Sequence, residues 1–133
     1  MNWQKKDYDN IPGTYVFDGK RAHPAYPINK LLYSLNDDAN RKELDADPAA
    51  YCDKFGVTGE YKRAVIENDF LALIRSGANI YYLAKMAVPR GVTVQDAGAQ
   101  FQGITTEEFR QNLLKKGEGL TEKIANRGDY WNG

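Results

Sequence analysis

The 133-residue chain is poor in the residue types that metal sites and catalytic sites use most often. It has one cysteine, Cys52, and one histidine, His23. A single cysteine excludes a disulfide within the chain, and one residue of each type is too few for a zinc site or for an iron site with two histidines. No nucleophile elbow, phosphate-binding glycine loop or dinucleotide fingerprint is present. These absences argue against a self-contained enzyme and favour a subunit role.

Charge and hydropathy argue against two further kinds of partner. The 18 lysines and arginines balance 18 aspartates and glutamates, so the chain lacks the excess of basic residues that follows nucleic acid phosphates. The longest apolar runs, residues 70–74 and 80–84, are far too short to span a bilayer, and no signal-like segment precedes them. We therefore expect one cytoplasmic domain that binds neither nucleic acid nor a membrane.

Apolar positions that recur with the period of a helix predict an all-α fold. Ile28, Leu31, Leu32 and Leu35 mark one amphipathic helix directly after Pro27. Further helices are expected over residues 38–46, 48–56, 58–76, 78–86 and 105–116. The last of these begins with a predicted capping box of Thr105 and Glu108. The expected architecture is a small irregular helical domain with an extended N-terminal arm.

Three parts of this domain are expected to differ in character. Residues 1–27, here called the N-terminal arm, contain proline and glycine breaks but also many aromatic side chains, so we expect an ordered segment that lies over its own domain or over a partner. Residues 28–116 form the helical core, and residues 117–133 a flexible or partner-docking tail.

The segment 78–86 is apolar or aromatic around almost its whole circumference. Asn79 and Lys85 are its only clearly polar positions, whereas a surface helix normally has a polar face. It is therefore either a central core helix or a helix packed on two sides. We expect it to pack against the helix of residues 58–76 and to support the segment 90–103, which we interpret as an irregular loop that either contacts a partner or connects helices in solvent.

Several segments, in order and at near-constant spacing, resemble the small (alpha) subunit of protocatechuate 4,5-dioxygenase, a LigAB-type extradiol ring-cleavage enzyme. The resemblance covers residues 11–114. The segments that carry it are Ile11-Pro12-Gly13-Thr14-Tyr15-Val16-Phe17, Arg21-Ala22, Tyr26 with Asn29, Asn40-Arg41, Ala49-Ala50-Tyr51, Gly77 with Asn79-Ile80-Tyr81-Tyr82-Leu83 and Lys85, and Gly103-Ile104-Thr105 with Glu107-Glu108-Phe109.

This resemblance implies a mainly helical subunit that pairs with a larger beta subunit. The beta subunit would hold Fe(II) with two histidines and a glutamate and would cleave a catecholic ring with O2. The small subunit would cover the mouth of that site and shape the pocket for an aromatic substrate. On this interpretation our chain has no catalytic residue, no metal and no cofactor of its own, which agrees with its single histidine.

The resemblance also suggests which residues face the partner. The family places an aromatic side chain against the substrate where this chain has Val94, so a valine opens space and the identity of the catecholic substrate does not carry over. The expected pocket edge is Val94, Arg90, Val92, Gln95 and Phe101, and the expected partner interface is Trp3, Tyr8, Tyr15, Phe17, Tyr81 and Tyr82. Arg90 would either attract a substrate carboxylate or lie solvated.

A second interpretation belongs to a different class. The chain would be a stand-alone helical binding or self-associating module that shares the fold and has no dioxygenase partner. The departure at Val94 favours this alternative slightly.

Overall fold

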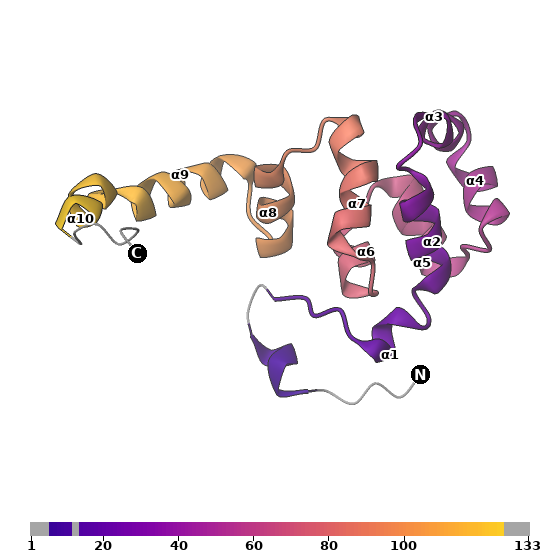
Figure 1. Cartoon of the computed structure of the whole chain (residues 1–133), viewed down its shortest axis with the longest axis horizontal. Coiled ribbons are helices and arrows are strands. Elements are labelled where there is room, and N and C mark those ends of the chain that lie inside the picture. The colour runs from indigo at the N-terminus through magenta and orange to yellow at the C-terminus, as the bar shows by residue number, and fades with distance from the viewer. Residues whose placement is uncertain (1–5, 12–13, 127–133) are drawn as a thin grey trace, which may run out of the picture.

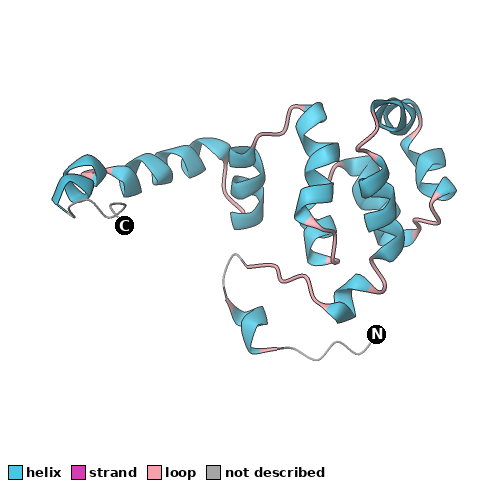
Figure 2. Cartoon of the chain, in the orientation of Figure 1, coloured by secondary structure: helices cyan, strands magenta, loops and turns pink. Residues whose placement is uncertain are grey.

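The computed structural model describes residues 6–11 and 14–126, and within these ranges every regular element is a helix (Figures 1 and 2). The elements in order are η1 (Asp7–Asn10), α1 (Gly19–Ala22), α2 (Tyr26–Ser34), α3 (Asp38–Ala46), α4 (Pro48–Lys54), α5 (Gly59–Glu67), α6 (Phe70–Arg75), α7 (Ile80–Ala87), η2 (Val88–Arg90), α8 (Val94–Gln102), α9 (Thr106–Gly117) and α10 (Leu120–Asn126). The predicted all-α class is confirmed. None of the described helices combines the length and apolar character that a membrane span requires.

Helices α2 to α7 form the helical body, which contains nearly all of the core. Leu31 and Leu32 of α2 and Leu35 at its C-cap are completely buried, and α7 packs along α2. Asn29 joins the two helices by polar contacts as well, because its side-chain amide donates to the Gly77 carbonyl at 3.0 Å and its side-chain oxygen accepts from the backbone N–H of Asn79 at 2.7 Å. The start of α7 is therefore fixed by hydrogen bonds from α2.

Aspartate caps explain why the short helices of the body begin where they do. The side chains of Asp37 and Asp47 accept hydrogen bonds from the first turns of α3 and α4. Pro48 occupies the first turn of α4, where its fixed φ and missing N–H cost nothing. Each cap satisfies backbone donors that the helix itself leaves unpaired.

The prediction of one helix over residues 58–76 is wrong, because the chain breaks at Asn68. This residue has φ +56°, the left-handed conformation that ends α5. Asp69 then caps α6 by accepting from the N–H of Ala72 at 3.0 Å. Asparagine is one of the few residues that tolerate left-handed backbone, so Asn68-Asp69 combines a stop with a start. The break was not predicted because the apolar periodicity continues across these two residues.

Helix α7 is one-sided, which answers the question raised by its sequence. Leu83 and Met86 are buried, while Tyr81 is 79% exposed. Among the α-helices its main neighbour is α2, and α6 is a weaker one, so the expected packing on residues 58–76 holds only for their α6 part and misses α2. The helix begins at Ile80 after Asn79, whose side-chain oxygen accepts from the N–H of Tyr81 at 2.9 Å.

The segment expected to be an irregular loop, residues 90–103, contains helix α8. Thr93 and Asp96 form a capping box at its start. Glycine at 98 weakens the helical pattern, but it has a packing role: a Cβ there would lie 2.6 Å from Cζ of Phe109. The residue that disfavours a helix in the sequence therefore allows α9 to approach α8.

Helices α9 and α10, here called the C-terminal arm, project away from the body and bury no residue (Figure 1). The predicted capping box of α9 is present, with Thr105 and Glu108 bonding to each other's backbone. Part of the expected tail, residues 120–126, is helical as α10. Residues 127–133 lie outside the described ranges.

Candidate functional site

An apolar groove of about 320 Å³ lies between α7 and α8 and is the strongest candidate for a site. It forms because the chain reverses after α7. Gly91, with φ +81°, follows η2 as its C-cap, and the N–H of Val92 donates to the Ala87 carbonyl at 3.1 Å. Helix α8 returns beside α7 as a result. The walls are Ile80, Leu83, Ala84 and Ala87 of α7, Val88, Val92 and Thr93 of the connection, Val94, Ala97, Gly98 and Phe101 of α8, and Phe70 of α6.

No side chain that lines the groove is ionisable. The single side-chain hydroxyl there belongs to Thr93, and it is already engaged, because it donates to Asp96 at 2.7 Å and accepts from the Asp96 N–H at 3.1 Å. The hydrogen bond from the Thr93 side chain, with further bonds from the Thr93 backbone and from Thr106, lowers the pKa of Asp96, which is therefore ionised at neutral pH. The groove can bind by apolar contact and shape.

Three of the five residues expected at a pocket edge line this groove. Val92 and Phe101 are half-buried walls, and Val94, in the first turn of α8, is 86% exposed. The other two have partners elsewhere. Gln95 accepts from Nε of Arg110 at 2.7 Å, which connects α8 to α9.

Arg90, the fifth of these residues, is turned towards α3 and the α5–α6 break. Its guanidinium forms an ion pair with Asp45 at 3.2 Å and donates to the side chain of Asn68. The side chain is only 19% exposed. Its contacts connect η2 to the body, and it is not among the residues that line the groove.

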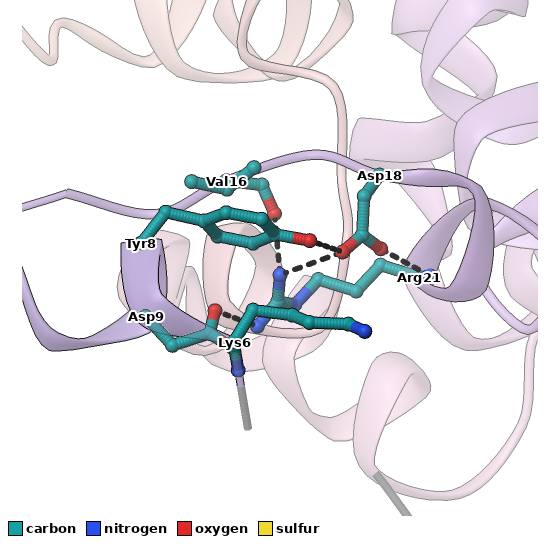
Figure 3. A network of polar contacts seen from close by, with 6 residues as sticks. All are labelled: Lys6, Tyr8, Asp9, Val16, Asp18 and Arg21. Carbon is teal, nitrogen blue, oxygen red and sulfur yellow. Dashed lines mark hydrogen bonds and ion pairs between the residues drawn. The ribbon is translucent and has the colours of Figure 1, made fainter. Parts of the chain in front are cut away.

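Arg21 organises the described part of the N-terminal arm (Figure 3). Its guanidinium donates to Asp9 at 2.7 Å, to Asp18 at 3.3 Å and to the Val16 carbonyl at 3.0 Å. Asp18 also caps α1 and accepts from the hydroxyl of Tyr8 at 3.0 Å. One arginine thereby joins η1, the extended stretch and α1.

Tyr15 joins the N-terminal arm to the groove region. Its hydroxyl donates to the backbone carbonyl of Phe101 at 3.0 Å, and the two rings meet edge to face with centroids 5.9 Å apart. The guanidinium of Arg75 lies 5.5 Å from the Tyr15 ring centroid. The arm therefore contacts α8 directly, next to the groove wall formed by Phe101.

Aromatic side chains gather around a second hollow of about 440 Å³ between the arm, α2 and α7. Phe17 and Tyr82, both expected at a partner interface, line it. Tyr26 and Tyr33 of α2 line it too, and the sequence reasoning did not select them. Both could have been selected from the sequence, because they lie off the apolar stripe of Ile28–Leu35. Both are exposed in the structure. Trp3 lies outside the described residues.

Across residues 6–11 and 14–126, no three histidine, cysteine, aspartate or glutamate side chains come together as metal ligands would. His23 is exposed just after α1, and Cys52 is buried in α4, where burial raises the pKa of its thiol. The described residues do not fit an iron centre.

One comparison with known proteins bears on this arrangement. The model of the family described as "Aromatic-ring-opening dioxygenase LigAB, LigA subunit" matches residues 28–114. The matched stretch begins in α2 and ends in α9, so it contains the helical body except the first two residues of α2, and every wall of the groove.

Proposed function

The chain belongs to the LigA-subunit family of LigAB aromatic-ring-opening dioxygenases, and from this premise we propose that it caps and shapes the active site of a larger LigB-type subunit. The complex would open the ring of a catecholic acid with O2 by extradiol cleavage. The iron would belong to the larger subunit, since the described residues of this chain do not fit it. No step of the chemistry is assigned to a residue of this chain.

The observation that carries the proposal is the open apolar groove between α7 and α8. Its rim includes Val94 and Val88, which are 86% and 62% exposed. Apolar side chains that lie together in contact with water are unfavourable on a surface that has no partner. A partner placed over this rim would bury it. The groove would then exclude water from the neighbouring site and restrict the position of the ring.

Exposed and half-buried aromatic residues near the groove support the same placement of the large subunit. Tyr81 follows the groove residue Ile80 in α7, and Tyr82 and Phe17 line the neighbouring hollow. Tyrosine and phenylalanine are enriched in protein interfaces because they bury large area with few rotatable bonds. In the proposed complex these residues and the groove rim form one continuous contact with the large subunit.

Co-expression with the large subunit tests the proposal. We expect a stable complex, with ring opening of 3,4-dihydroxybenzoate followed by oxygen uptake. Val94→Trp should lower kcat/KM about tenfold or more by filling the groove, without preventing complex formation. Ile66→Trp is the matched control, because Ile66 is an exposed apolar residue of α5 outside the groove.

Two results would contradict the proposal. Ring opening by this chain alone would place the chemistry in it. A homo-oligomer that ignores the large subunit, with unchanged kcat/KM when the chain is omitted, would instead support a stand-alone binding module.

A further inference from the structure

Resting on the proposed function, we infer that the ring substituent that reaches this subunit is uncharged and apolar. Any carboxylate on the same ring then lies against the large subunit. The inference concerns substrate class, and it follows from which chemical groups line the groove between α7 and α8 and from where the nearest charges point.

The groove offers no partner to an anion. Its walls are aliphatic and aromatic carbon apart from the Thr93 hydroxyl, which is occupied within the capping box of α8. A carboxylate that enters such a space loses its water and gains no hydrogen bond in return. Burial of this kind disfavours the charged form.

The charges nearest to the groove reinforce this selection. Lys85 and Arg90 are the cations closest to the groove along the chain, and neither lines it, because both line a separate small hollow beside α3. Arg90 is also paired there with Asp45 and Asn68. The N-terminus of α8, which would otherwise attract an anion, already holds the Asp96 carboxylate, whose oxygen accepts from the Thr93 N–H at 2.8 Å. A second anion there would meet Asp96 at close range and be repelled.

For an apolar substituent, entry into the groove is favourable. It transfers carbon surface from water to a carbon-lined wall, and no polar group of the protein loses a partner. The volume of about 320 Å³ readily admits a methyl, methoxy or longer alkyl group, and the rim at Val94 is open.

The test uses the assembled complex and three catechols that share one ring carboxylate. The first has no further substituent, the second adds a methyl group, and the third adds a second carboxylate at the same ring position. Dissociation constants are measured without O2, so that no turnover occurs, and kcat/KM is then measured with O2. The small-subunit variants are Val94→Lys and, as control, Ile66→Lys.

We expect the wild-type complex to accept the methyl compound and to bind the dicarboxylate at least about tenfold more weakly than the methyl compound. Val94→Lys should reverse this preference by about tenfold, because it supplies the cation that the rim lacks. Ile66→Lys should leave the preference unchanged.

The inference is overturned if the wild-type complex binds the dicarboxylate as well as the methyl compound. It is also overturned if Val94→Lys leaves the penalty intact, since the selection would then reside in the large subunit. Failure of the proposed function has a different signature: kcat/KM for all three compounds would be the same when this chain is omitted.

Discussion

The helical body and the C-terminal arm are both helical, yet different interactions hold their helices in place. Across α2 to α7 each helix buries apolar residues against its neighbours, and α2 together with its C-cap residue Leu35 has three leucines with no exposed surface. Helices α9 and α10 bury none, and Leu113, Leu114, Leu120 and Ile124 are exposed. The body is held by tertiary packing, whereas the C-terminal arm relies on local capping and on the contacts of α9 with α8, which are Phe109 against Gly98 and the side-chain hydrogen bonds of Arg110 and Thr106.

This difference separates two kinds of structural role. A region with its own core can present a groove of fixed shape without a partner. A helix with exposed leucines and little packing is ordered more weakly, and its apolar side chains gain most from contact with another surface. Helix α8 stands between the two, since Ala99 is its one fully buried residue and it contacts both α6 and α9.

Removing a leucine from each region gives the largest expected contrast. Leu32→Ala leaves a cavity in the body and should lower the free energy of unfolding by about 2–5 kcal/mol. Leu114→Ala, at a residue 67% exposed on α9, should change it by less than about 0.5 kcal/mol. Urea denaturation followed by circular dichroism measures both. An equal loss in the two variants would mean that the arm packs as the body does.

Glycines with positive φ give a smaller contrast of the same kind. Gly77 has φ +98°, and a Cβ there would lie 2.8 Å from the backbone oxygen of Arg21 and 3.1 Å from Cβ of Ala25. Gly77→Ala should therefore cost about 2–4 kcal/mol, the sum of backbone strain and overlap with α1 and α2. Gly119, in the C-terminal arm, has φ +71° with nothing near its Cβ position, so Gly119→Ala should strain only the turn between α9 and α10, by about 1–2 kcal/mol, and should shift the unfolding of the body less.

The thermal midpoint of unfolding measures both substitutions. A milder effect of Gly77→Ala than of Gly119→Ala would show that the α6–α7 turn can move away from α1, and that the close approach there is not a constraint of the body.

Local signals in the sequence identified the features that depend on a few neighbouring residues. The capping box at Thr105 and Glu108 is an example, because every group in it lies within four positions. The break at Asn68 was missed because apolar periodicity continues across it. Helix α8 was missed because Gly98 reads as a breaker until Phe109 is placed against it.

Contacts between distant positions could not be read from the sequence. Arg90 was expected at a pocket edge, and its pairing with Asp45, 45 positions away, depends on how α3 and η2 meet. The same holds for Tyr15 and the carbonyl of Phe101, 86 positions apart. The aromatic and aliphatic character of the groove was visible in the sequence, but the reversal at Gly91 that assembles its walls was not.

The smallest expected difference between the two regions is their response to acid, because each contains one capping carboxylate with a lowered pKa. Hydrogen bonds from Arg63, and then from the Ala72 backbone, lower the pKa of Asp69 in the body. Hydrogen bonds from the Thr105 backbone, and then from its side chain, lower the pKa of Glu108 in the arm. A carboxyl whose native pKa is depressed stabilises the fold above its unfolded pKa, about 4, and this stabilisation is lost as pH falls through the native value.

Below about pH 4 the two losses should therefore appear in different measurements. Protonation of Asp69 should lower the urea midpoint of the whole body, and Asp69→Asn should lower the midpoint at pH 7 and flatten its decline in acid. Protonation of Glu108 should speed amide hydrogen exchange in the first turn of α9 and leave the midpoint unchanged, as should Glu108→Gln at pH 7. If Glu108→Gln shifts the midpoint as far as Asp69→Asn does, the arm unfolds together with the body, and the distinction between locally capped and tertiary-packed helices does not hold for this protein.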